Sequence, residues 1–226
     1  GSEMCIRDSL PKIDKSITLI GNYSSGDNSE FNNLVPGAMQ AQDIYLIIGP
    51  PGTGKTSFGM LNVLKEQLLH PDTSVLLMAY TNRAVDEICS KLKEENIDFL
   101  RLGNDFSCAP EYHDNLLSNK ARLCNNIDDI RHLIINSRII CGTTTAFNSH
   151  TEIFSLKSFQ LAIIDEASQI LEPHIIGLLS AKHDKENAIE KIVMIGDEKQ
   201  LPAVVQQEAN ESVVNSKSLN DIGLTD

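Results

Sequence analysis

The sequence "IIGPPGTGKTS", residues 47–57, decides how the rest of the chain is interpreted. Residues 43–48 are mostly apolar and predict a buried strand, while Gly49, Gly52 and Gly54 let the following backbone take turns closed to residues with a side chain. Such a loop points successive amide N–H groups into one concavity at the start of the next helix, where they can hold phosphate oxygens. The alternative interpretation is a glycine-rich turn with a surface lysine.

The loop carries the groups that bind a nucleotide. Lys55 would reach the outer phosphates, and the hydroxyl of Thr56 would ligate Mg²⁺. We expect the nucleotide to contact a continuous run of residues, namely Gly49, Pro50, Pro51, Gly52, Thr53, Gly54, Lys55, Thr56 and Ser57. The sequence therefore predicts a site for a nucleotide and Mg²⁺.

The amino-acid composition limits the kinds of partner that this chain could bind. The chain has 226 residues, enough for one α/β domain and some extra, and its 41% hydrophobic content can supply a core. No apolar run reaches membrane-spanning length, so no membrane partner is expected. The net charge of −12 argues against a basic patch for duplex DNA, but it allows a single strand to be held through amides, hydroxyls and a few cations. The five cysteines form no C-x-x-C pair, which favours reduced thiols in a cytoplasm over a zinc site or disulfides.

Six apolar runs alternate with helical patterns. They are residues 45–49, 74–80, 98–102, 138–143, 160–165 and 191–196. This alternation predicts an α/β fold with a mostly parallel sheet and helices on both faces. Residues 83–95 form an amphipathic pattern that suits a covering helix. Residues 104–136 are polar with two weak helical patterns, which we interpret as a small helical insertion.

Two further stretches end predicted strands, at the edge where an open α/β sheet binds its ligands. The sequence "LAIIDEASQ" (161–169) places Asp165 and Glu166 after an apolar run, which suits a carboxylate for Mg²⁺ and a neighbour that activates water. The sequence "IGDEKQLPAVV" (195–205) ends another predicted strand with Asp197 and Gln200, polar groups that could sense a γ-phosphate or orient water. Taken alone, an Asp-Glu pair such as that in residues 161–169 is more often the solvated start of a helix. The polar residues in 195–205 would, taken alone, be a helix cap.

Five segments resemble, in order, motifs I, Ia, Ic, II and III of superfamily 1 helicases. They are "GPPGTGKT" (49–56), "MAYTNRAVDEI" (78–88), "CGTTTAF" (141–147), "DEASQ" (165–169) and "GDEKQLPAVV" (196–205). The most similar branch contains the nonsense-mediated-decay RNA helicase and the DNA-replication helicase-nucleases. The resemblance implies the N-terminal RecA-like, P-loop NTPase domain of an ATP-dependent helicase. Such an enzyme couples ATP hydrolysis to translocation and unwinding on single-stranded DNA or RNA, and the family favours 5′-to-3′ movement.

The resemblance also assigns roles. The catalytic group would be Lys55, Asp165, Glu166 and Gln200, in which Lys55 binds phosphate and Asp165 supports Mg²⁺ together with Thr56. Glu166 would be the general base, and Gln200 would couple the γ-phosphate to the nucleic-acid site. The residues implied to touch the single strand are Thr81, Asn82, Thr143, Thr144 and Thr145, which could also be turn and cap residues.

One family feature has no clear counterpart. The glutamine that reads adenine in this family lies upstream of the P-loop, but Gln40 and Gln42 are too close to the strand. The usual position falls near Asn32 or Asn33, so the sequence does not predict adenine selectivity.

Both ends of the chain are expected to be incomplete. The sequence "EMCIRDS" looks like a translated sequencing adapter, so we expect residues 1–9 to be an artefact, the alternative being an ordinary flexible terminus. We interpret residues 10–37 as a poorly defined segment, residues 38–207 as the RecA-like domain and residues 208–226 as a polar tail. The second RecA-like domain, which carries motifs IV to VI and the family's catalytic cations, is expected to be missing. This chain alone is therefore expected to bind nucleotide without acting as a helicase.

Two alternative functions stay open at this point. One is a P-loop ATPase that remodels protein without nucleic acid, and the other is a nucleotide-binding module without catalysis. The threonine-rich segments at residues 80–87 and 142–147 have no role in the first alternative. The intact Lys55, Asp165 and Glu166 argue against the second.

Overall fold

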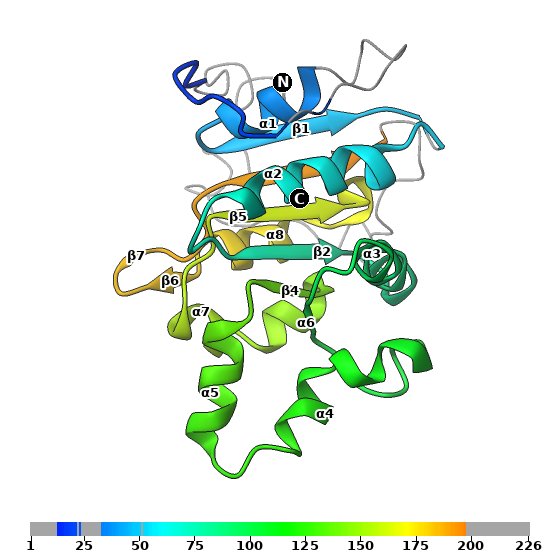
Figure 1. The fold of residues 1–226 in the computed structure, drawn as a ribbon, viewed down its shortest axis with the longest axis vertical. Helices are drawn as coiled ribbons and strands as arrows, with labels where there is room; N and C mark the ends of the chain where they lie inside the picture. The colour runs from blue at the N-terminus through cyan, green and yellow to red at the C-terminus, as the bar shows by residue number, and fades with distance from the viewer. Residues whose placement is uncertain (1–12, 22, 24–32, 51, 198–226) are drawn as a thin grey trace, which may run out of the picture.

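A six-stranded parallel sheet forms the centre of the computed structural model, which describes residues 13–21, 23, 33–50 and 52–197 (Figure 1). The strand order is β1-β8-β5-β2-β4-β3, and each neighbouring pair is parallel. The strands are β1 (Ile44–Ile48), β2 (Val75–Ala79), β3 (Leu100–Arg101), β4 (Ile139–Thr143), β5 (Leu161–Asp165) and β8 (Ile192–Gly196). All six coincide with predicted apolar runs, so the predicted fold class is confirmed.

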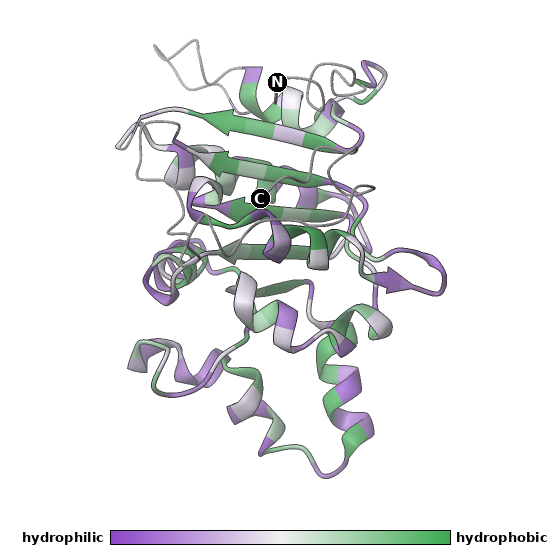
Figure 2. Cartoon of the chain, turned by 180° about the vertical axis from the view of Figure 1, so that it is seen from behind, coloured by the Kyte–Doolittle hydropathy of each residue, from purple (hydrophilic) through white to green (hydrophobic). Residues whose placement is uncertain are grey.

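Burial explains why these runs form strands. Every residue of β2, β4 and β5 is buried, as expected for central strands of a parallel sheet covered on both faces. These strands are strongly hydrophobic in Figure 2. Strand β1 lies at the edge and differs: Ile47 is buried, whereas Leu46 and Ile48 are more than half exposed.

Helices cover both faces of the sheet and enclose two separate cores (Figure 1). Buried residues of the helices α1 (Leu34–Gln40), α2 (Leu61–Leu69) and α3 (Asn82–Glu94) pack on one face. The other face packs against buried residues of α5 (Ile127–Asn136), α6 (Thr144–Ser149), α7 (Glu152–Leu156) and α8 (Glu172–Leu179). The predicted helix at residues 83–95 corresponds to α3, whose Val85, Ile88 and Leu92 are fully buried.

Two short elements complete this layer arrangement. A 3₁₀ turn, η4 (Ala167–Gln169), follows β5, and the strands β6 (Lys182–His183) and β7 (Glu186–Asn187) form a separate antiparallel hairpin. In the part of the chain that the structure describes, no helix is long and apolar enough to cross a membrane.

The segment predicted as an insertion contains short helices at the β3 end of the sheet (Figure 1). They are η3 (Pro110–Asn115), α4 (Leu117–Ala121) and α5. At its start, the fully buried guanidinium of Arg101 donates to the Asp86 carboxylate (2.6 Å) and to the carbonyl of Ser107 (3.1 Å). At its end, the Lys157 ammonium donates to two carbonyls at the end of α5. Buried cations therefore tie both ends of the insertion to the sheet layers.

The interpretation of residues 10–37 as poorly defined needs correction for its described part. Helix α1 begins at Leu34 and crosses the expected boundary, and four of its residues are buried in the core. Further upstream, the fully buried carboxylate of Glu66 accepts hydrogen bonds from the backbone amides of Ile20 (2.6 Å) and Gly21 (2.9 Å). The helical pattern was hidden because Pro36 and Gly37, both poor helix formers, interrupt it.

Candidate active site

The loop after β1 has the predicted left-handed backbone at two of its three glycines. Gly52 (φ 75°) and Gly54 (φ 84°) both lie in the left-handed region, which residues with a side chain rarely adopt. A π-helical turn, η2 (Lys55–Met60), follows directly, and the amides of Phe58 and Gly59 both donate to the carbonyl of Gly54. Such π turns are frequent at functional sites. The loop therefore opens a helix in the way that a phosphate-binding loop requires.

Two side chains of the loop donate hydrogen bonds to the loop's own backbone carbonyls. The Lys55 ammonium donates to the carbonyls of Gly49 and Pro50, and the Thr53 hydroxyl donates to Pro50 (2.8 Å). Ser57 is exposed. Pro51, also predicted to contact phosphate, lies outside the described residues.

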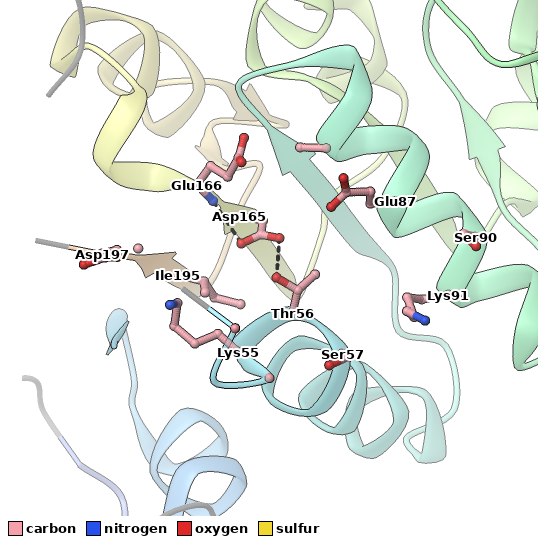
Figure 3. Close-up of a pocket in the computed structure, with 14 residues that line it drawn as sticks. Lys55, Thr56, Ser57, Glu87, Ser90, Lys91, Asp165, Glu166, Ile195 and Asp197 are labelled. Atoms are coloured by element: carbon pink, nitrogen blue, oxygen red, sulfur yellow. Dashed lines mark hydrogen bonds between the residues drawn. The ribbon is translucent and has the colours of Figure 1, made fainter. Parts of the chain in front are cut away.

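Thr56 and Asp165 meet at the carboxyl edge of the sheet. The Thr56 hydroxyl donates to Oδ2 of Asp165 at 2.7 Å, and Oδ1 of the same carboxylate accepts from the backbone amide of Glu166 at 2.9 Å (Figure 3). Asp165 is buried, which raises the pKa of its carboxyl, while these two hydrogen bonds and Lys55 act in the opposite direction. The two predicted Mg²⁺ ligands are thus side by side.

Glu166 has an unusual backbone conformation. Its φ of 53° and ψ of 35° are left-handed, a conformation that costs energy outside glycine and concentrates at functional sites. Burial raises the pKa of its carboxyl first, and Asp165 and Glu87 raise it further, whereas Arg83 and a hydrogen bond with Thr81 lower it. Its Oε2 is buried without a hydrogen-bond partner among the described residues.

These groups line one cavity of about 590 Å³ between the loop, the sheet edge and α3. The lining residues are Gly52, Gly54, Lys55, Thr56, Ser57, Ala84, Glu87, Ser90, Lys91, Asp165, Glu166, Ile195, Gly196 and Asp197. Figure 3 shows Glu87 projecting from α3 on the same side as the Asp165 and Glu166 carboxylates.

Asp197, which the sequence indicated together with Gln200, is buried after β8 and lines this cavity. The sequence did not indicate Glu87, Ser90 and Lys91 of α3, because these polar residues matched a solvated helix face.

The residues predicted to touch single-stranded nucleic acid lie at the carboxyl ends of β2 and β4. The Thr81 and Thr143 hydroxyls cap α3 and α6, accepting from the amides of Ala84 and Ala146 at 3.1 Å each. Asn82 and Thr145 are exposed. The Thr144 side chain is fully buried, so it does not face a surface where single-stranded nucleic acid could lie.

Gln200 lies outside the described residues, as does Asn32, one of the two positions where the family's adenine-reading glutamine would fall. Asn33 occupies the N-cap position of α1 and is not among the lining residues. No adenine contact is therefore assigned.

A sequence model of a family described as "AAA domain" matches residues 27–122 and 110–208. The chain belongs to this family. It is 35% identical over 206 residues to the DNA replication ATP-dependent helicase/nuclease JHS1 of Arabidopsis thaliana, covering 90% of this chain and 14% of that protein. It is 33% identical over 204 residues to the DNA replication ATP-dependent helicase/nuclease DNA2 of Mus musculus, covering 88% of this chain and 18% of that protein.

The fold also matches a solved structure. The UvsW helicase from bacteriophage T4 superposes with a TM-score of 0.53 at 13% identity, covering 83% of this chain and 56% of that one. This likeness concerns the fold alone. The two sequence relatives confirm the resemblance to the branch of the DNA-replication helicase-nucleases. The chain spans less than a fifth of the length of these two relatives.

Proposed function

We propose that this domain binds ATP and Mg²⁺ and drives a helicase along a single strand of nucleic acid. The observation that carries the proposal is the 2.7 Å contact between Thr56 and Asp165 beside the left-handed loop glycines. It joins the phosphate loop to the end of β5, where Glu166 follows. The family membership and the helicase/nuclease relatives support the same function.

Thr56 and Asp165 fit Mg²⁺. This ion prefers oxygen ligands, and in nucleotide sites it takes one or two protein groups together with waters and phosphate oxygens. A hydroxyl and a carboxylate already within hydrogen-bonding distance need little movement to share it. When bound, the ion would neutralise charge on the nucleotide's outer phosphates.

Lys55 and Glu166 would act on the two sides of the γ-phosphate. Lys55 would exchange the carbonyls of Gly49 and Pro50 for phosphate oxygens, which are stronger acceptors. Glu166 would orient the attacking water and accept its proton, and a raised pKa suits a general base. The role of Gln200 in sensing the γ-phosphate stays a prediction.

The single strand would cross the ends of β2 and β4, next to the nucleotide cavity. Exposed Asn82 and Thr145 are the best-placed side chains to contact its backbone, and Thr81 lies at the start of α3. We propose DNA as the first substrate to test, because the named relatives are DNA replication enzymes, with RNA as the alternative.

A second RecA-like domain would close on the nucleotide cavity as the partner. A cytoplasmic location is supported by the free thiols of the four described cysteines, which suit a reducing compartment.

Binding of single-stranded nucleic acid can be tested directly. Fluorescence anisotropy with labelled oligo(dT) and oligo(U) should detect binding that weakens with salt. Thr145→Val should reduce the affinity for the oligonucleotides, because it removes an exposed hydroxyl near the carboxyl end of β4. Ser149→Ala, one turn further along α6, should leave this affinity unchanged. Failure to bind either oligonucleotide would remove nucleic acid from the proposed function and favour a protein-remodelling ATPase.

A further inference from the structure

A fully exposed aromatic ring stands on the loop that follows β3. Phe106 has an exposed fraction of 101%, so its ring packs against neither core. Such a ring does not stabilise the fold, because apolar side chains do so only through the surface that they bury. Its surface is therefore available to a ligand.

The loop that carries this ring is fixed by its own hydrogen bonds. The side-chain carbonyl of Asn104 accepts from the backbone amides of Phe106 (3.0 Å) and Ser107 (3.1 Å). The Ser107 hydroxyl accepts from the Asn104 amide and donates to the Asn104 carbonyl, both at 3.1 Å. Because the loop is already ordered, a ligand that binds it loses little affinity to ordering it.

Contacts with the sheet layers place this loop beside the start of α3. One nitrogen of the buried Arg101 guanidinium donates to the carbonyl of Ser107 at 3.1 Å and to that of Asn82 at 3.5 Å. Further along the loop, the Ala109 amide donates to the Asp86 carboxylate at 3.2 Å. The loop thus adjoins Asn82, the exposed residue proposed above to contact single-stranded nucleic acid.

The order of the sheet extends the path of the nucleic acid to this loop. The carboxyl ends of β2, β4 and β3 follow one another, and the Leu102 amide continues the pairing by donating to the Cys141 carbonyl at 2.8 Å. Neighbouring strands are about 4.8 Å apart, so the loop after β3 begins about 10 Å from the end of β2. In Figure 1 the segment that precedes α4 lies below α3, on the side to which the arrow of β2 points. Nucleic acid that crosses the ends of β2 and β4 therefore reaches Phe106 next.

Charge indicates which part of the nucleic acid faces the ring. Asp105 directly precedes Phe106, and a carboxylate at this position repels a phosphate group. A base is uncharged and presents a flat π face, which stacks on an aromatic side chain. The loop therefore suits a base better than a phosphate.

We propose that Phe106 is a stacking platform for one base of the bound single-stranded nucleic acid, beyond the residues that contact the phosphates at the ends of β2 and β4. The inference rests on the proposed function, since it requires nucleic acid across these ends. Because every base has a π face, the platform would accept DNA or RNA of any sequence.

Equilibrium binding of labelled oligo(dT) and oligo(U) to variants of the 226-residue chain tests the platform. Phe106→Ala should lower the affinity for both at least about fivefold, the lower end of what stacking on an aromatic ring contributes. Phe106→Tyr keeps the ring and should bind as wild type does. Phe106→Leu is apolar without a ring and should bind nearly as weakly as Phe106→Ala. Wild-type affinity in Phe106→Leu would overturn the stacking role.

An oligonucleotide of abasic units separates stacking from a change in the phosphate contacts. It has the same sugar-phosphate chain without bases, so wild type and Phe106→Ala should bind it equally. For oligo(dT), the slope of log affinity against log salt should be the same in both proteins, because the number of phosphate contacts is unchanged. A fivefold loss of affinity for the abasic chain, or a smaller salt slope, would show that Phe106 acts through the phosphates and would contradict the inference.

Leu123→Ala is the matched control. Leu123 is also highly exposed (85%), but it lies in the turn between α4 and α5, away from the sheet (Figure 1). This variant should bind both oligonucleotides as wild type does. If wild type binds oligo(dT) and Phe106→Ala binds it equally well, the inference alone is wrong. If wild type binds neither oligonucleotide, the proposed function fails and the inference falls with it.

Discussion

The hydroxyl of Thr56 donates to the carboxylate of Asp165 at 2.7 Å, although 109 residues separate them in the chain. This contact places the start of the P-loop helix against the end of β5. It predicts that the two residues act together on one metal ion. Thr56→Val and Asp165→Asn should each weaken Mg²⁺-dependent nucleotide binding by roughly tenfold or more, and the double variant should lose little beyond that. Calorimetric titration with ADP in Mg²⁺ and in EDTA checks this, and an equal loss in EDTA would contradict a metal role.

Glu166→Gln should separate binding from chemistry. The amide is nearly isosteric with the carboxylate but cannot accept a proton from water, so turnover should fall by about 10² or more while nucleotide affinity changes little. The measurement is single-turnover hydrolysis beside equilibrium binding. An unchanged rate would exclude Glu166 as the base.

The chain alone should hydrolyse ATP slowly, well below about one turnover per second, and should not unwind a duplex. Among the described residues that line the cavity, the cations are Lys55 and Lys91, and Lys91 is paired with Glu94 at 2.9 Å. A further cation that reaches the γ-phosphate contributes about 10³ to 10⁵ in rate in comparable enzymes. Steady-state ATPase assays with single-stranded DNA and RNA check this. Rapid strand-stimulated turnover would show that the catalytic cation lies within this chain.

Lys157 should make stability depend on pH. Burial lowers the pKa of its ammonium from 10.5 to about 8 in the folded chain. The unfolded chain therefore binds more protons between pH 8 and 10.5, and this residue's contribution to the free energy of unfolding rises with pH across that window. Relative to Lys157→Met, wild type should gain on the order of 1 to 3 kcal/mol between pH 7.5 and 10. Urea unfolding of both proteins measures the difference, and a pH-independent difference would contradict the buried charge.

The sequence predicted the strands and the phosphate loop because those signals are local. Continuous apolar runs can only be buried strands or helices, and the loop needs glycine where φ is positive, as at Gly52 and Gly54. Helix α1 was missed because Pro36 and Gly37 mask its short pattern.

Contacts between distant segments could not be predicted in the same way. The α3 face that carries Glu87 and Lys91 is polar whether it faces water or a nucleotide cavity, so its pattern does not distinguish the two. The burial of Thr144 depends on how α6 packs on the sheet. Only the fold brings Thr81 next to Glu166.

Nucleotide binding by the Lys55 variant tests the central claim most directly. Titration of a fluorescent ATP analogue with Mg²⁺ should give saturable binding to wild type, and Lys55→Ala should weaken it by about tenfold or more, because a cation facing the outer phosphates is lost. Lys65→Ala is a matched control, since Lys65 lies on α2 and pairs with Glu95 at 2.7 Å, and it should bind as wild type does. Wild-type affinity in Lys55→Ala would contradict the assignment of this loop as the nucleotide site.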